Sequence, residues 1–329
     1  MSKTYLSGIQ PSGLLHIGNY FGAIQQQVAL SKQDGSHFYF IADYHSLTSL
    51  RDADKLRALV RETAITYLAC GLDPEQAVLF RQSDVPEVTE IQWLLSTVTG
   101  MGLLERAHSF KDKIANGVEP TVGLFTYPIL MAADIVAYDS DIVPVGKDQV
   151  QHIEMTRDMV GYFNQKYKSE VFKRPEMLLE KSETMQKVPG IDGQKMSKSY
   201  GNDIWIFEEG KKLKKRVGKI VTDSRPPEEP KDPSELFVFD LLALFLGADE
   251  LADWKTKVAA GGADAPGYGH LKMRLKDAIE DHFAEAREKR LELLDQPKLV
   301  DEILANGAAK ARTRAREVRD RALHACGLR

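Results

Sequence analysis

Cysteine and long apolar runs are scarce in this chain of 329 residues. Its two cysteines, Cys70 and Cys326, have no second Cys or His at metal-ligand spacing, which excludes a zinc site built on a CxxC pair. No stretch approaches the roughly 18 consecutive apolar residues that a membrane-spanning helix needs. The segment from Met1 to Gln10 also lacks the basic and apolar regions of a secretory signal. We therefore expect reduced thiols and a cytosolic protein that does not enter a membrane.

The chain also has little excess charge of either sign. Its 44 Lys and Arg against 48 Asp and Glu give a net charge of -4, which argues against a protein whose whole surface coats nucleic acid. Basic residues nevertheless gather in two runs, from Lys211 to Lys219 and from Lys310 to Arg329. Each run is either a solvated helix face or a surface for a polyanion. With 43% hydrophobic residues, a chain of this length has room for about two domains.

Strands and helices are predicted to alternate in the first part of the chain. The segment from Thr4 to Ile9 has the pattern of a short strand, and Leu14 to about Lys32 has apolar residues at helical spacing. The segments 37–42 and 77–80 are further strands, with an amphipathic helix between them that ends at Gly71. This alternation predicts an α/β fold with a parallel sheet, in which ligands bind beyond the carboxyl ends of the strands.

The remaining sequence is predicted to be mostly helical. Residues from about 86 to 140 look like helices, and the short apolar segment from Asp141 to Val145 follows them. After Ser199 helical patterns dominate, interrupted by a proline-rich stretch at 222–234. We place a domain boundary near residues 200 to 206.

The first segment that could carry chemistry runs from Gly8 to Tyr20, with the sequence GIQPSGLLHIGNY at a predicted strand-to-helix junction. Small residues such as Gly13 and Gly18 let a nucleotide approach the backbone, and the amino terminus of the new helix favours phosphate. His16 could donate hydrogen bonds to phosphate oxygens. Taken alone, the segment fits an ordinary strand-to-helix turn with a surface histidine equally well.

The second segment, Gly190 to Asn202, contains the pentapeptide KMSKS at residues 195–199. Lys195 and Lys198, flanked by hydroxyl groups on a glycine-bounded loop, can bring two ammonium groups to a polyphosphate. The alternative is a flexible, solvated loop. Because an intact HIG sequence precedes this pentapeptide by about 175 residues, chance is a poor explanation for the presence of both.

Together, HIGN at His16–Asn19 and KMSKS at Lys195–Ser199 resemble the motifs of the class I aminoacyl-tRNA synthetases. Within that class, GIQPSG at Gly8–Gly13 resembles the bacterial tryptophanyl-tRNA synthetases. The resemblance covers nearly the whole chain. Further matching segments are Phe110–Lys113, Tyr127–Ile135, Val143–Gln149 and Gln151–His152.

The resemblance implies a Rossmann-like parallel-sheet catalytic domain over residues 1–205, with a helical insertion at about 86–140. It also implies a smaller all-helical domain over 206–329 that binds the tRNA anticodon. Such an enzyme activates L-tryptophan with ATP to tryptophanyl-adenylate and pyrophosphate, then transfers tryptophan to the 3′-terminal ribose of tRNA(Trp). Mg²⁺ bound with ATP, no structural metal and a homodimer are expected on the same ground.

The resemblance also assigns residues to roles. The expected catalytic residues are His16, Lys113, Lys195 and Lys198. The expected ATP-binding residues are Gln10, Pro11, Ser12, Gly18, Asn19, Gly146, Lys147, Asp148, Val188, Lys195, Met196, Ser197, Lys198 and Ser199. The expected tryptophan-binding residues are Leu6, His45, Tyr127, Met131, Asp134, Val143, Val145 and Gln149.

Asp134 is the residue expected to matter most for the choice of amino acid. A carboxylate can accept a hydrogen bond from the indole N–H, which is a donor only, between apolar walls. Without the resemblance, a helix N-cap or a surface salt bridge would be the simpler interpretation of this aspartate.

Three rival functions remain at this stage. A tyrosyl-tRNA synthetase also uses a carboxylate in its pocket, but GIQPSG argues against it. A nucleotidylyltransferase with an HxGH-like turn would account for His16 but not for the KMSKS lysines. A synthetase retained only for RNA binding or regulation would not need His16 and both lysines.

Overall fold

The computed structural model describes residues 2–107, 110, 114, 115, 117, 119–179 and 187–328, apart from the side chain of Asp148. The chain forms two compact units. Unit 1 consists of Met1–Ser12, Gln27–Glu180 and Leu293–Arg329, and unit 2 of Gly13–Gln26 and Lys181–Glu292.

Unit 1 is built on a five-stranded sheet in the order β3-β2-β1-β4-β5, in which every strand pairing is parallel. The strands are β1 (Thr4–Ile9), β2 (Ser36–Ile41), β3 (Val78–Arg81), β4 (Ile142–Val145) and β5 (Glu176–Leu179). The predicted parallel α/β fold is confirmed. Strand β5 was not among the predicted elements, because its apolar segment, Met177 to Leu179, is only three residues long.

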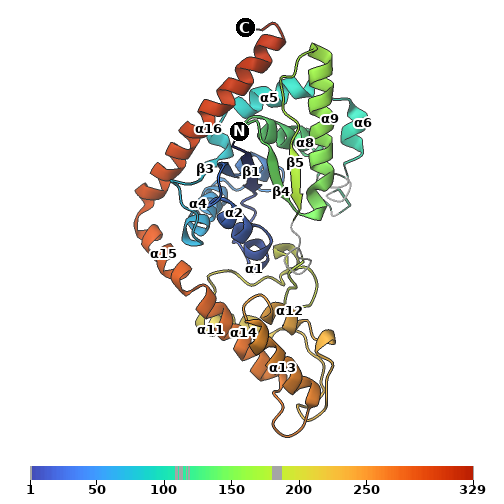
Figure 1. Cartoon of the computed structure of the whole chain (residues 1–329), viewed down its shortest axis with the longest axis vertical. Helices are drawn as coiled ribbons and strands as arrows, with labels where there is room; N and C mark the ends of the chain where they lie inside the picture. The colour runs from blue at the N-terminus through green and yellow to red at the C-terminus, as the bar shows by residue number, and fades with distance from the viewer. Residues whose placement is uncertain are drawn as a thin grey trace. The chain divides into compact units, whose positions relative to one another are not determined.

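The strand order of unit 1 reverses between β1 and β4, which is where ligands bind in open parallel sheets. Helices connect and cover the strands (Figure 1). The helical segments are α2 (Gln25–Leu30), α3 (Asp43–Ser46), α4 (Ala53–Ala69), η2 (Gln82–Asp84), α5 (Glu87–Ser96), α6 (Met101–Glu105), α8 (Val122–Val136), η3 (Lys147–Gln149), α9 (Val150–Tyr167) and α16 (Pro297–Ala325).

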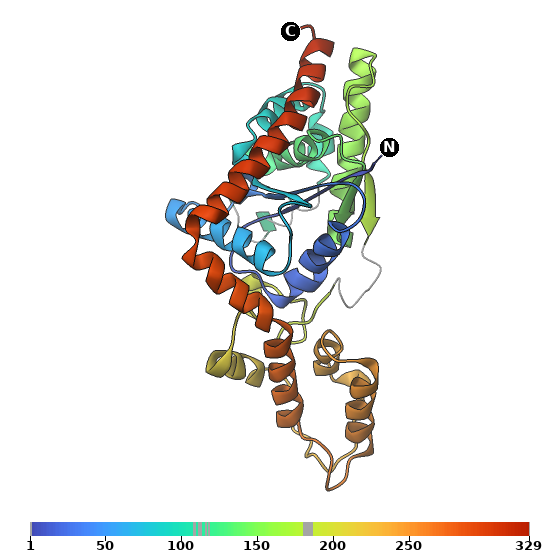
Figure 2. The same ribbon diagram turned by 60° about the vertical axis from the view of Figure 1, so that its left-hand side comes forward.

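The long carboxy-terminal helix α16 packs against β3 and α5 of unit 1, as Figures 1 and 2 both show. Its small residues join the core of the unit, among them Ala308, Ala311 and Ala315. The approach is so close that a Cβ added to Gly307 would lie 1.9 Å from the carbonyl oxygen of Leu79. Glycine at position 307 therefore sets the distance between α16 and the edge strand of the sheet.

Arginines of α16 form ion pairs with the acidic residues of unit 1. Glu87, which is 1% exposed, is 2.9 Å from both Arg312 and Arg316. Arg319 pairs with Glu90 at 2.8 Å, and Arg314 pairs with Asp139 at 2.9 Å. These ion pairs bind the arginine-rich helix α16 to the rest of unit 1.

Unit 2 is helical. Its segments are α1 (Ile17–Asn19), η1 (Tyr20–Ile24), η4 (Lys198–Tyr200), α11 (Gly210–Gly218), η5 (Pro233–Glu235), α12 (Val238–Leu242), α13 (Ala248–Ala260), α14 (Tyr268–His282) and α15 (Ala284–Asp295). The helix predicted from Leu14 to about Lys32 is present as α1, η1 and α2, with one π-helical turn in its middle.

The division into units differs from the domain boundary predicted near residue 205. Residues 13–26 group with unit 2 because the backbone N–H of Ile17 donates to the carbonyl of Ile204 at 2.9 Å, and that of Ile206 to Leu15 at 3.1 Å. Residues 293–329 group with unit 1 because α16 packs on β3. Pairing between distant segments, which composition does not reveal, decides both assignments.

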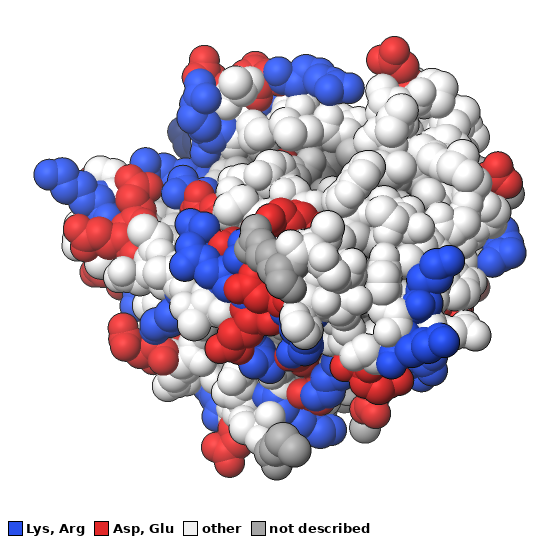
Figure 3. Space-filling model, turned by 90° about the horizontal axis from the view of Figure 1, so that it is seen from above, with Lys and Arg blue, Asp and Glu red and all other residues white. Residues whose placement is uncertain are grey.

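Some large apolar side chains of unit 1 are exposed. Trp93 on α5 is 70% exposed, and Met101 on α6 and Val122 at the start of α8 are also exposed. Seen from above, the molecule has a broad area with few charged side chains (Figure 3). Within the described residues, no helix has the length and apolarity to cross a membrane.

Candidate active site

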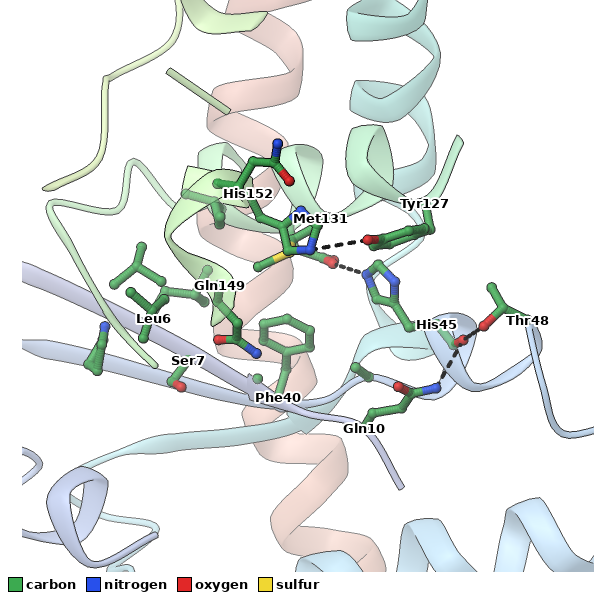
Figure 4. Close-up of a pocket in the computed structure, with 18 of the residues that line it drawn as sticks. Leu6, Ser7, Gln10, Phe40, His45, Thr48, Tyr127, Met131, Gln149 and His152 are labelled. Atoms are coloured by element: carbon green, nitrogen blue, oxygen red, sulfur yellow. Dashed lines mark hydrogen bonds and ion pairs between the residues drawn. The ribbon is translucent and has the colours of Figure 1, made fainter. Parts of the chain in front are cut away.

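A cavity of about 670 Å³ lies in unit 1 at the point where the strand order reverses. Residues of β1, β2 and β4 line it, among them Leu6, Ser7 and Phe40, which Figure 4 labels, and α8 and the segment after β2 contribute to its walls. All the residues predicted to bind tryptophan line it: Leu6, His45, Tyr127, Met131, Asp134, Val143, Val145 and Gln149. Gln10 and Lys147, predicted to bind ATP, line the same cavity. Parallel-sheet topology thus gathers residues that are far apart in sequence.

Asp134 lies in the last turn of α8 and is 2% exposed. Its Oδ2 is 2.9 Å from Nε2 of His45, and Nε2 of Gln82 is 2.8 Å from both of its carboxylate oxygens. The N-cap of α8 is Thr121, so Asp134 is not a cap, and its burial rules out a surface salt bridge. Both simpler interpretations of this aspartate are therefore wrong.

Burial raises the pKa of Asp134, and the hydrogen bonds from His45 and Gln82 act in the opposite direction. An ionised carboxylate offers about four lone-pair sites, so these two partners leave room for one more donor. A further N–H group that enters the cavity can therefore bind the same carboxylate.

Other polar contacts shape the wall of the cavity. The hydroxyl of Tyr127 is 3.1 Å from Nε2 of His152, and the two rings meet edge to face (Figure 4). The side-chain amide of Gln10 donates to the carbonyl oxygen of His45 at 3.2 Å, and the hydroxyl of Thr48 donates to the same oxygen at 2.8 Å. These contacts hold His45 and Tyr127, whose rings meet edge to face, in place beside each other on the wall of the cavity.

Two buried residues behind the cavity were not among the predicted site residues. Gln82 binds Asp134, and Asp43 accepts hydrogen bonds from the hydroxyl of Ser83 and, at 2.9 Å, from its backbone N–H. Asp43 is the second residue after β2, and Gln82 is the first residue after β3. Their place at the carboxyl ends of strands was the signal that could have identified them.

The predicted phosphate-binding segments meet within unit 2. His16 forms an isolated β-bridge with Trp205, six residues after the KMSKS sequence ends. A Cβ added to Gly13 would lie 2.8 Å from Cδ of Lys198. The turn before α1 and the lysine loop, which we define as Lys195–Ser199, are therefore neighbours. Two segments about 175 residues apart in sequence thus form one cluster, as the sequence predicted.

His16 caps the short helix α1. Its Nδ1 accepts from the backbone N–H of Asn19 at 3.2 Å, and Oδ1 of Asn19 accepts from the backbone N–H of His16 at 3.1 Å. Burial, with the nearby ammonium groups of Lys198 and Lys195 and against the opposing effect of Asp203, lowers the pKa of His16 to about 4. The imidazole is therefore neutral at pH 7, and its Nε2 is left as an N–H donor because Nδ1 is an acceptor.

The lysine loop is held by buried residues at its base. Met196 is buried, and its backbone N–H donates to the carbonyl of Val188 at 2.8 Å. Oδ1 of the buried Asn202 accepts from the backbone N–H of Ser197 at 2.7 Å, and its Nδ2 donates to the carbonyl of Lys195 at 3.2 Å. The loop is thereby fixed at its backbone while its lysine side chains remain available.

The two lysines of the loop differ in their surroundings. Lys195 is exposed, whereas burial lowers the pKa of Lys198 to about 8, against the opposing effect of Asp203. Within the part of the chain that the structure describes, neither lysine has an ion pair. The hydroxyls of Ser197 and Ser199 are 2.8 Å apart beside them. The loop therefore presents positive charge and hydroxyl donors that suit a phosphate group.

The other predicted residues occupy varied positions. Pro11 is buried, Ser12 and Lys147 are exposed, and Gly18 lies against His16, 3.0 Å from its Nδ1 if given a Cβ. Lys113 lies outside the described residues, as does the side chain of Asp148. Gly146 is the N-cap of η3. Among the described residues, no group of three or more His, Cys, Asp and Glu side chains could hold a metal ion.

Comparison with known proteins matches the chain to one family over most of its length. The family model of the class I tRNA synthetases for tryptophan and tyrosine (W and Y) matches residues 2–284. The tryptophan–tRNA ligase of Rhodopirellula baltica is 53% identical over 327 residues, which cover 98% of this chain and 99% of that protein. That of Fusobacterium nucleatum is 54% identical over 327 residues, 99% of this chain and 98% of that protein.

The fold has a counterpart among solved structures. The crystal structure of tryptophanyl-tRNA synthetase from Campylobacter jejuni, complexed with ADP and tryptophan, matches with a TM-score of 0.91 and 46% identity. The match covers 99% of this chain and 100% of that one.

Proposed function

The chain belongs to the class I tRNA synthetases of the bacterial tryptophan–tRNA ligase family, and on that premise we propose how its residues divide the reaction. It is an ATP-using ligase that joins tryptophan to tRNA. We assign recognition of tryptophan to the cavity of unit 1. The triphosphate of ATP falls to the turn before α1 and the lysine loop of unit 2.

The observation that carries this proposal is the buried carboxylate of Asp134 on the wall of a cavity that has both apolar and polar side chains. The indole N–H of tryptophan donates to Asp134, while Leu6, Met131, Val143 and Val145 contact the ring. A charge-assisted hydrogen bond to a buried carboxylate discriminates against an amino acid that leaves its remaining acceptor position without a donor. Tyr127 and Gln149 face the α-ammonium group of the amino acid, and His45 lies beside Asp134 in the same pocket.

The lysine loop supplies charge stabilisation for the first step. The tryptophan carboxylate attacks the α-phosphorus of ATP, the bond to the β-phosphate breaks, and pyrophosphate leaves. A carboxylate is already a nucleophile at neutral pH, so the protein must mainly align the reactants and offset the charge that builds on the leaving phosphates. Lys195 and Lys198 do so with their ammonium groups, and neutral His16 donates from Nε2.

The remaining predicted ATP contacts are also assigned to the nucleotide. Gln10, Pro11, Ser12, Gly146 and Lys147 are assigned to the nucleotide within unit 1, together with Asp148. Gly18, Asn19, Val188, Met196, Ser197 and Ser199 are assigned to it within unit 2. Lys113 is assigned to the phosphates. Mg²⁺ is expected to arrive on the ATP phosphates, because this ion keeps several waters and uses few protein ligands in such sites.

In the second step a ribose hydroxyl at the 3′ end of tRNA attacks the carbonyl carbon of the adenylate and AMP leaves. The tRNA is assigned to helix α11, whose exposed lysines are Lys211, Lys212, Lys214 and Lys215, while Leu213 is buried beneath them. Helix α16 is a weaker candidate because its arginines already pair with Glu87, Glu90 and Asp139.

We also propose that the protein is a homodimer in the cytoplasm. Trp93, Met101 and Val122 lie exposed on α5, α6 and α8, and both α5 and α6 pack against α8. Exposed apolar side chains on neighbouring helices of one unit suit an interface with a second copy of the chain. Sedimentation of the wild type and of Trp93→Glu tests this: the substitution should shift the protein toward the monomer.

Amino-acid-dependent exchange between ATP and pyrophosphate tests the main proposal. The purified protein should catalyse this exchange with tryptophan and not with tyrosine, and should then charge tRNA(Trp). Dependence on tyrosine would favour the tyrosyl-tRNA synthetase alternative. Absence of exchange with any amino acid would favour the non-catalytic one.

A further inference from the structure

We propose that Gln82 is a positioning residue for tryptophan recognition, one that acts through Asp134 without contacting the substrate. The inference rests on the proposed role of Asp134. Gln82 is 1% exposed and opens η2 directly after β3. It does not belong to the cavity wall, whereas Asp134 does. Its amide therefore lies behind the carboxylate that we assign to the indole N–H.

The orientation of the Gln82 amide is fixed by its second partner. Its Oε1 accepts the backbone N–H of Tyr44 at 3.1 Å, so the NH₂ group must be the end that faces Asp134. Reversing the amide would place oxygen against the carboxylate and leave the Tyr44 N–H facing an amine. Tyr44 also donates to Asp43 at 3.0 Å, and Asp43 in turn holds Ser83. The segments after β2 and β3 are tied together at this point.

The contact with Gln82 governs both the charge and the direction of Asp134. Nε2 of Gln82 lies at the same 2.8 Å from both oxygens, whereas His45 reaches only Oδ2. An amide has no titratable proton, so its hydrogen bond favours the ionised carboxylate across the physiological pH range. A carboxylate without this donor would bear the full cost of its burial, would take up a proton more readily and could turn away from the cavity.

Gln82→Met tests the inference, because methionine keeps the length of the side chain without a donor or acceptor. We expect kcat/KM for tryptophan to fall about 10- to 150-fold, the range for a lost hydrogen bond to a charged group, with an unchanged KM for ATP. The analogue β-(3-benzothienyl)alanine has sulfur in place of the indole N–H and should lose little. The acid limb of the pH profile with tryptophan should move to higher pH.

Gln27→Met is the matched control, because Gln27 is also a buried glutamine of unit 1. Its partners are Ser7 at 2.7 Å and Tyr67 at 2.6 Å, and neither is Asp134. This variant should leave the ratio of kcat/KM for tryptophan and the benzothienyl analogue unchanged. If Gln82→Met lowers both substrates equally, or moves neither the ratio nor the pH profile, Gln82 is only a structural residue and the inference is wrong.

Asp134→Asn separates this inference from the proposed function. If that variant leaves tryptophan kinetics unchanged, the role of Asp134 itself is wrong. If it lowers kcat/KM and Gln82→Met does not, only the role of Gln82 is refuted. Should Gln82→Met fail to fold, Gln82→Asn keeps both polar groups but withdraws the donor by one carbon, and the same ratio of substrates should shift in the same direction.

Discussion

The cavity of unit 1 and the lysine loop of unit 2 hold their charged groups in opposite ways. In the cavity, Asp134 is buried and already bonded to His45 and Gln82. In the loop, Lys195 is exposed, and among the described residues neither it nor Lys198 has an ion pair. A preformed polar pocket suits selection of an amino acid by shape and one hydrogen bond. Uncompensated cations suit a charge that is greatest in a transition state.

The largest expected effect comes from the lysine loop. Lys195→Ala should lower kcat for adenylate formation about 100- to 1000-fold, as loss of one stabilising donor does elsewhere, while tryptophan binding changes little. Rapid-quench measurement of adenylate and equilibrium binding of tryptophan check the two parts. Lys214→Ala, an exposed lysine of the same unit, is the control. Equal loss in rate and in tryptophan affinity would contradict the division between the units.

For the cavity we expect the opposite result, a loss in the use of tryptophan without a change in the binding of ATP. Asp134→Asn replaces an anionic acceptor by a neutral amide, and kcat/KM for tryptophan should fall about 10- to 150-fold with an unchanged KM for ATP. Pyrophosphate exchange at varied tryptophan and ATP measures both parameters. Asp84→Asn, which removes a half-buried carboxylate paired with Arg81, should have no such effect. An altered KM for ATP in Asp134→Asn would argue against a pocket that recognises only the amino acid.

The next effect concerns how closely helix α16 packs on strand β3 of unit 1. Gly307→Ala places a methyl group against the carbonyl of Leu79 and should lower the free energy of unfolding by about 1–3 kcal/mol. Gly123→Ala has open space at its Cβ and should stay within about 0.5 kcal/mol of the wild type. Urea unfolding compares the two. Equal stability of both variants would show that α16 does not pack on β3 as closely as described.

The exposed lysines of helix α11, unlike the paired arginines of α16, are expected to bind tRNA. Charge reversal of Lys211, Lys214 and Lys215 to Glu should weaken tRNA binding and reduce its salt dependence by about 0.7–0.9 per lost phosphate contact. Filter binding over a range of salt concentrations measures this. The same reversal at exposed Lys32, Lys55 and Lys166 is the control. A comparable loss of adenylate formation in the α11 variant would count against a role in tRNA binding.

The smallest expected effect is a proton taken up on nucleotide binding. The pKa of Lys198 is about 8 in the free protein, so this lysine loses its charge as the pH rises through 8. A triphosphate beside it favours the charged form, and at pH 8 binding should take up about half a proton more than in Lys198→Met. Titration calorimetry with ATP in two buffers of different ionisation enthalpy measures the difference. Identical proton uptake in the two proteins would place the triphosphate elsewhere.

The folded state also gains stability as Lys198 and its neighbour lose their protons. The folded pKa of His16 is lowered from 6.5 to about 4, so the unfolded chain binds the extra proton between these values and stability rises with pH over that window. For Lys198 the corresponding window runs from about pH 8 to 10.5. At neutral pH the burial of Lys198 therefore costs stability, whereas the burial of His16, which is neutral there, does not.

The residues that the motifs single out lie together in the fold, whereas the domain boundary expected near residue 205 differs from the division into two units. All the residues expected to bind tryptophan line one cavity, and HIGN and KMSKS form one cluster. In contrast, the arginine-rich end was expected in a separate carboxy-terminal domain, yet it packs on the sheet of unit 1. A run of arginines has the same sequence pattern whether its partners are water, RNA or Glu87, and only the fold supplies the partner.

Local spacing along the chain predicted the strands and helices of the first half and the HIGN and KMSKS motifs, because each depends on neighbours within one turn or on a fixed spacing. The residues of the cavity were expected from the family resemblance, since they come from segments between Leu6 and Gln149 that no local pattern connects. The folded chain was needed to show that Gln82 lies behind Asp134, that Asn202 anchors the lysine loop, and that α16 packs on β3. Those contacts join residues between 5 positions apart, for Ser197 and Asn202, and 228 positions apart, for Leu79 and Gly307, and hydrogen bonding and packing at such separations are set by the three-dimensional path of the chain.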